Sequence, residues 1–80
     1  MKIVMRDGRV FQGTALQIVK AMQGIAFGVD DFTVPEYIEW VVANTLKFEE
    51  IALEVTGETD EELAASLIAE MIRVGLTAKR

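Results

Sequence analysis

The chain has 80 residues and contains no cysteine and no histidine. Without these residues it cannot form a disulfide, a zinc site with Cys or His ligands, a thiol nucleophile or an imidazole proton shuttle. It also lacks a Walker loop, a G-x-G-x-x-G motif and a serine nucleophile elbow, and its one serine, Ser66, lies inside a stretch with helical periodicity. We therefore expect no catalytic residues, no cofactor and no enzymatic activity.

Long apolar runs are absent as well. The longest run, Trp40 to Ala43, is far shorter than the ~18 residues that a membrane-spanning helix needs. Arg6, Asp7 and Gly8 interrupt the start of any signal-peptide apolar stretch. We expect a cytoplasmic protein without a membrane partner. A chain this short buries only about 60% of its unfolded surface, so residues 1–80 are expected to form a single domain.

What is present in excess is apolar surface. When the six glycines are added to the 51% of hydrophobic residues, the apolar share exceeds the ~45–50% that is usual for soluble domains. The net charge of −5 is unevenly distributed, because residues 29–70 contain twelve acidic residues and only one cation, Lys47. Such asymmetry either keeps exposed helix faces solvated, which we favour, or guides a charged partner or a second copy.

The N-terminal residues predict a β-hairpin. Two short β-branched runs flank Asp7-Gly8, a dipeptide that accepts positive φ. A two-residue turn would place Arg6 opposite Arg9, which is an unfavourable like-charge pair. We therefore expect a three-residue loop with Gly8 left-handed, which pairs Met5 with Arg9, Val4 with Val10 and Ile3 with Phe11.

Three helices are predicted after the hairpin, over about 15–27, 34–48 and 60–74. Each begins with a capping box, in which a threonine hydroxyl and the side chain three residues later bond each other's backbone amides. The three pairs are Thr14 with Gln17, Thr33 with Glu36, and Thr59 with Glu62. Gly75 is expected to end the last helix in a Schellman turn, with Leu76 packed back on Met71.

Residues 51–56 alternate between apolar and polar side chains, which is typical of a strand with one buried face. The alternative is that the second helix continues through them, since Phe48, Ala52 and Val55 also have helical spacing. We favour the strand, because a third strand gives the hairpin a useful apolar face. The predicted fold is α+β, in the order ββααβα, with a small three-stranded sheet packed against three helices.

Acidic pairs are the only candidates for a metal site. They are Asp30-Asp31, Glu49-Glu50 and the cluster from Glu58 to Glu62. None has the alternating oxygen ligands and the glycine bend of a calcium loop. We expect no metal site, and interpret these acids as loop and helix-start residues.

A nucleic-acid contact is one possible function. Lys2, Arg6, Arg9 and Lys20 with Phe11 form a small basic set around the hairpin. However, the sequence pI of about 4.6 argues against it, and the interval between the first two helices is too long for a helix-turn-helix. We favour the interpretation that these cations are simply solvated, and consider nucleic acid an unlikely partner.

Protein contact is the function that we favour. Helical periodicity places Trp40 on the polar side of the second helix, and large exposed aromatics are enriched in interfaces. The alternative is that Trp40 is buried under the third helix or the 27–32 loop. Ala65 and Ala69, four residues apart, would let another helix approach closely, or would serve packing within the chain. We expect a homo-oligomer, with a two-fold dimer as the first hypothesis, and an unidentified protein partner as a further possibility.

Three segments carry a resemblance to known proteins: Asp7-Gly8-x-Val10-Phe11-x-Gly13-Thr14, Tyr37 to Trp40, and Gly57 to Ala64. Together they resemble a family of small uncharacterised bacterial proteins, some of them prophage-associated. The resemblance implies a bacterial cytoplasmic accessory protein and implies no catalytic or binding residues. The sequence therefore predicts a non-enzymatic interaction module acting as a homo-oligomer. The alternative is a weak nucleic-acid-binding accessory protein that uses the basic hairpin.

Overall fold

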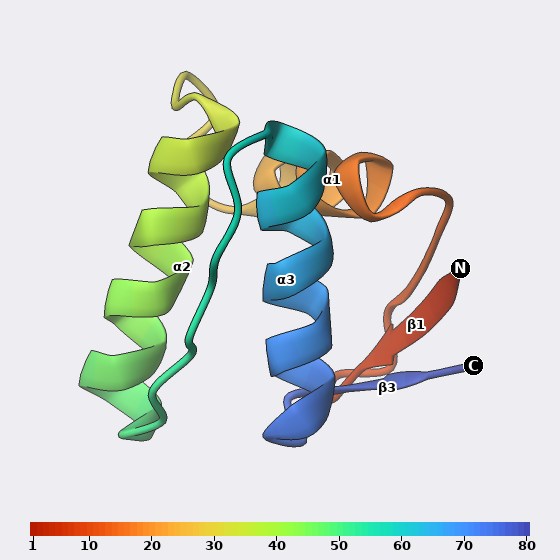
Figure 1. Ribbon diagram of the computed structural model, residues 1–80. Coiled ribbons are helices and arrows are strands. Elements are labelled where there is room, and N and C mark those ends of the chain that lie inside the picture. Colours follow the sequence, from red (N-terminus) through yellow and green to blue (C-terminus); the bar gives the residue numbers. More distant parts are fainter.

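The computed structural model describes residues 1–80 and contains three helices and three strands (Figure 1). In chain order they are β1 (Lys2–Met5), β2 (Val10–Gln12), α1 (Ala15–Ile25), α2 (Val34–Glu49), α3 (Asp60–Arg73) and β3 (Thr77–Lys79). The expected α+β class, with a three-stranded sheet and three helices, is confirmed. The position of the third strand differs from the expected one, and the observed order is ββαααβ.

The hairpin has the expected register. Val4 pairs with Val10 and Ile3 with Phe11, and the Met5 amide donates to the Arg9 carbonyl at 2.8 Å. Gly8 has a φ of 91°, so the three-residue loop with a left-handed glycine is confirmed. Ile3 is fully buried whereas Val10 is 44% exposed. The helices therefore cover one face of the sheet and leave the other face open.

All three capping boxes are present, with both reciprocal hydrogen bonds in each. The Schellman turn after α3 is also confirmed. The Leu76 amide donates to the Met71 carbonyl at 2.9 Å, the Gly75 amide donates to the Ile72 carbonyl at 3.1 Å, and Gly75 has a φ of 84°. These local hydrogen bonds fix where the helices begin and how the last one ends.

Residues 51–56 are extended but belong to no sheet. Figure 1 shows why: α2 and α3 run in the same direction, and the link between them returns along their length. A 16-residue helix such as α2 is about 24 Å long, and a helical link of ten residues would span only about 15 Å. The link must therefore be extended, and because its neighbours on both sides are helices, it finds no strand to pair with.

The third strand is β3, at the end of the chain, and it replaces the strand expected over 51–56. It pairs antiparallel with β1, with Val4 opposite Ala78 and Met5 opposite Thr77. The Thr77 hydroxyl donates to the Val4 carbonyl at 2.6 Å. The sheet order is thus β2-β1-β3, with the hairpin strand β1 at the centre.

The core lies between the sheet and the three helices. Its members are the thirteen buried apolar residues Ile3, Ile18, Val19, Met22, Val29, Val34, Tyr37, Ile38, Leu53, Ala64, Leu67, Ile68 and Met71. Two large apolar residues lie outside the core, Ile25 because it ends α1 and Phe48 because it lies in the last turn of α2. Gln23 is a buried polar residue, and its Nε2 donates to the carbonyls of Val29 and Phe32, both at 2.8 Å. It thereby holds the α1–α2 loop.

Two glycines provide a matched test of the backbone. Gly57 has a φ of 146°, and an added Cβ would lie 2.8 Å from the Glu62 Cβ. Gly24 lies in α1 with open space around it. We expect Gly57→Ala to lower the free energy of unfolding by about 1–3 kcal/mol, and Gly24→Ala to raise it by up to about 1 kcal/mol. Urea denaturation of both variants checks this, and equal effects would contradict the described link geometry.

Candidate interaction surfaces

Trp40 lies on the surface of α2 and is only partly covered. Its indole stacks on the Tyr37 ring, with the ring centroids 5.9 Å apart and 22° between the planes. Tyr37 is buried, whereas Trp40 remains 36% exposed. The predicted position of Trp40 on the outer side of the helix is thus correct in part, because Tyr37, in the adjacent turn of the same helix, covers part of the indole. The Trp40 carbonyl also accepts a hydrogen bond from the Asn44 side chain at 2.7 Å.

Trp40 belongs to a stripe along one flank of α2. Its members follow each other at spacings of three and four residues, which places them on one side of a helix. The stripe meets the hairpin loop and the end of α1 at two shallow hollows, of about 220 and 350 Å³, which share Met5, Asp7, Met22 and Tyr37. We define the aromatic flank as Tyr37, Trp40, Val41, Thr45 and Phe48 of α2 together with Ile25 of α1.

The charged groups beside the aromatic flank are of both signs. Arg6 lies 3.8 Å from Glu49, Arg9 lies 3.3 Å from Asp7, and the Lys47 ammonium lies 5.3 Å from the centre of the Phe48 ring. All of these pairs are exposed and contribute little to stability. They do, however, make this side of the molecule nearly neutral, in contrast with the rest of an acidic chain.

The four cations that the sequence analysis grouped around the hairpin do not all lie together in the structure. Arg6 and Arg9, at the loop, are each paired with an acid. Lys2 lies at the other end of β1, where its carbonyl accepts from the Arg80 amide at 2.8 Å, and Lys20 lies on the exposed side of α1. The four cations therefore form no continuous stripe for a phosphate backbone.

Ala65 and Ala69 are exposed on α3. Ser66 and Glu70, on the adjoining side of α3, bond the extended link between the helices. Trp40 lies on α2, where its ring stacks on Tyr37 of the same helix. The structure therefore does not bring the two alanines and Trp40 together into one surface.

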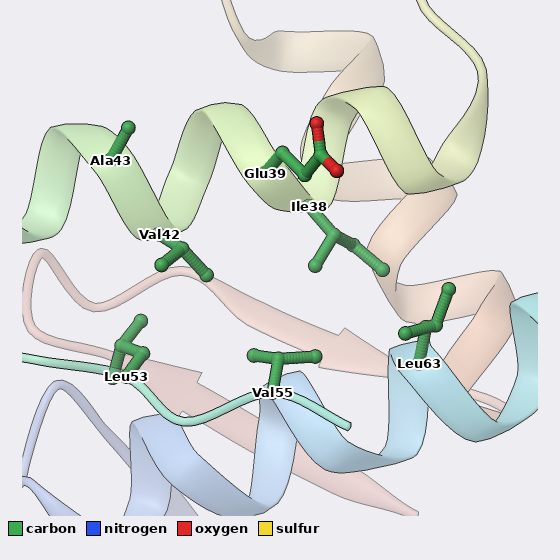
Figure 2. Close-up of a pocket in the computed structure, with 7 residues that line it drawn as sticks. All are labelled: Ile38, Glu39, Val42, Ala43, Leu53, Val55 and Leu63. Carbon is green, nitrogen blue, oxygen red and sulfur yellow. The ribbon is translucent and has the colours of Figure 1, made fainter. Parts of the chain in front are cut away.

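A second surface, not predicted from the sequence, lies on the side of α2 that faces the link. It is a groove of about 320 Å³ between α2, the link and the start of α3 (Figure 2). Ile38 and Val42 point from α2 toward Leu53 and Val55, and Leu63 closes one end. Glu39 and Ala43 lie on the outer rim. We call these seven residues the α2–α3 groove.

The link that forms one side of this groove is held mainly by side chains of α3. The Glu54 amide donates to Glu70 Oε1 at 2.8 Å, and the Thr56 amide donates to Ser66 Oγ at 3.0 Å. The backbone groups of Leu53 and Val55 form no hydrogen bond within the chain. Successive residues of an extended chain direct these groups to opposite sides, so those of Leu53 and Val55 face away from α3. On that side the Ile51 amide donates to the Thr45 carbonyl of α2 at 3.5 Å, and Leu53 is buried.

Glu70 is the anchor of the link. Its carboxylate receives two hydrogen bonds from Arg73, at 2.8 and 2.9 Å, in addition to the bond from Glu54. The Arg73 hydrogen bonds, followed by the Glu54 amide, lower the pKa of Glu70 to about 2. A guanidinium nitrogen of Arg73 also reaches the Ala52 carbonyl at 3.5 Å. Glu70 and Arg73 therefore hold the link as a unit.

The acidic residues considered as metal ligands are separated in the structure. No group of three or more Asp or Glu side chains is arranged to hold a metal ion. Glu62 serves the start of α3 instead, where bonds from the amides of Glu58 and Thr59 lower its pKa. No helix has both the length and the apolar character needed to cross a membrane.

Comparisons with known proteins add no assignment. No protein-family model, no curated protein and no solved structure matches the chain.

Tyr37 allows the aromatic flank to be tested by titration, because it is the single tyrosine. Burial raises its pKa to about 12, against about 10 for an exposed phenol. The folded state therefore favours the neutral phenol, and its stability should fall as pH rises from about 10 toward 12. We expect the ultraviolet signal of tyrosinate to appear near pH 12, with circular dichroism recorded in parallel. Ionisation near pH 10 in a folded protein would show that the ring is open to solvent.

Proposed function

We propose that the protein is a non-enzymatic interaction module that forms a homodimer through the aromatic flank. The observation that carries the proposal is the Trp40–Tyr37 stack, in which a large aromatic side chain remains partly exposed on a helix. Tryptophan and tyrosine are the residues most often found at the energetic centres of interfaces. The aromatic flank also includes Phe48, which is 70% exposed, and Ile25, which is 55% exposed.

The shape of the flank supports a contact between two helices. Its spacing of three and four residues is the pattern by which helices pack side chains into each other's grooves. The most exposed aromatic of the chain, Phe27, lies instead in the α1–α2 loop, outside any helix. The stripe on α2 is therefore better suited to a partner than the loop is.

The charges support a second copy as the partner. A chain with a net charge of −5 repels its own copies wherever acidic surfaces meet. Beside the aromatic flank, Arg6 and Arg9 accompany Glu49 and Asp7. A two-fold contact brings the same patch of both copies together, so each cation can meet an acid of the other copy. This flank is thus self-complementary in charge.

The dimer is tested by Trp40→Lys. Two lysines facing each other across a two-fold axis would repel and replace the aromatic contact, so we expect dimer affinity to fall at least about tenfold. Sedimentation velocity over a concentration series centred on the micromolar range measures this. The matched control is Leu46→Lys, an equal charge change at an exposed position of α2 on its other flank, which should leave the dimer unchanged.

Two results would overturn the proposal. One is a wild-type protein that stays monomeric throughout the series. The other is a dimer that both variants weaken equally, which would place the contact elsewhere on α2.

A further inference from the structure

We propose that the free edge of β2 binds an extended, acidic segment of another protein, which adds as a fourth strand to the sheet. The inference rests on the backbone groups of β2, on the exposure of its residues and on the unpaired cations around it. It does not depend on the dimer, because the aromatic flank is formed by α1 and α2.

The backbone of β2 supplies the directional part of recognition. β2 lies at an edge of the sheet and pairs with β1 alone. The Met5 amide of β1 donates to the Arg9 carbonyl at 2.8 Å. Because the bonds of an antiparallel ladder fall on every second residue, the amides and carbonyls of Val10 and Gln12 point away from β1. No backbone group elsewhere in the chain bonds them, so an extended segment can pair with them through main-chain hydrogen bonds.

This edge is open to a partner. Val10 is 44% exposed, and Gln12 is exposed as well. The other edge strand, β3, is less accessible, because its first residue, Thr77, is only 5% exposed. Addition of a strand to β2 therefore needs no rearrangement of the core.

A strand bound to β2 would present alternate side chains to the two faces of the sheet. Phe11 lies opposite the buried Ile3, so it faces the helices, where it lines the hollow of about 220 Å³ together with Ile25. Val10 lies opposite Val4, on the face that the helices leave uncovered. We therefore expect apolar side chains on the helix side of the bound strand, alternating with side chains that suit the uncovered face.

The charge around the edge favours an acidic partner. Lys2 and Arg80, joined by a backbone hydrogen bond of 2.8 Å, lie at one end of the sheet, and Lys20 is exposed on α1, which packs against β2. None of these cations forms a salt bridge. Asp7, the one acid of residues 1–28, is already paired with an arginine. The free cations favour Asp or Glu in the added strand and would repel the same cations of a second copy.

The test uses the synthetic peptide Glu-Val-Glu-Val-Glu-Val-Glu with blocked ends, titrated into the isotopically labelled protein and followed by NMR. We expect saturable shifts over residues 9–13 and slower hydrogen exchange of the Val10 and Gln12 amides, because the peptide bonds them. The same peptide with Lys in place of every Glu should bind at least about tenfold more weakly.

Three results would overturn the proposal. The first is a lack of saturable shifts over residues 9–13, and the second is equal binding of the two peptides. The third is exchange at Val10 and Gln12 that slows with protein concentration alone, which would assign the edge to a second copy.

Two variants at one position test the backbone contact. Gln12→Pro removes an outward amide and leaves the bonds to β1 in place, and we expect it to weaken peptide binding at least about tenfold. Gln12→Ala changes the side chain but keeps the amide, and should bind as the wild type does. Unchanged binding by a folded Gln12→Pro variant, or equal weakening by both, would exclude the edge of β2. If Gln12→Pro does not fold, the hydrogen exchange of the wild type decides.

The charge contribution is tested by Lys2→Glu, which reverses a cation on the sheet. We expect peptide binding to weaken about three- to tenfold. Lys47→Glu makes the same change on α2 and should have no effect at physiological ionic strength, where distant charges are screened. Equal weakening by both variants would show that the peptide senses only the net charge and would contradict the assignment to β2.

The Trp40→Lys variant separates the two proposals. Because Ile25 belongs to the aromatic flank and also lies beside Phe11, we expect Trp40→Lys to bind the peptide at least as tightly as the wild type. Binding lost with Trp40→Lys and kept with Gln12→Pro would place the peptide on the aromatic flank and overturn the assignment to β2.

Discussion

The structure depends on one geometric constraint, which is the return path between two helices that run in the same direction. After α2 ends at Glu49, the chain must travel back along the helix before α3 begins at Asp60. Ten residues cover that length only when they are extended, since an extended chain advances about 3.3 Å per residue and a helix about 1.5 Å. As a result Leu53 is buried in the core, and the link packs between both helices.

This constraint also determines the two surfaces. Because the link lies between helices, side chains of α3 bond its backbone in place of a neighbouring strand. The link does not pair with β1, and β3 pairs with that edge of β1 instead. In the chain, β3 comes directly after the Schellman turn that ends α3. The groove lies on the side of α2 that faces the link, whereas Tyr37, Val41 and Thr45 of the aromatic flank line a hollow with the hairpin loop.

The sequence predicted those features that depend on neighbouring residues. The three threonine capping boxes, the Asp7-Gly8 loop and the Schellman turn at Gly75 are decided within a few residues, and all are confirmed. The alternation over 51–56 correctly indicated an extended chain but could not identify its hydrogen-bond partners, which come from Ser66 and Glu70. The burial of Gln23 and the position of the groove could not be predicted from the sequence, because both depend on contacts between elements that are distant in sequence.

The central claim, an extended link whose Glu54 and Thr56 amides are bonded by side chains of α3, is tested most directly by residue-resolved amide hydrogen exchange. The account predicts slow exchange at Glu54 and Thr56 and faster exchange at Val55. It also predicts that Ser66→Ala removes protection at Thr56 and that Glu70→Ala removes it at Glu54. Equal protection along residues 53–56, unchanged in both variants, would contradict it.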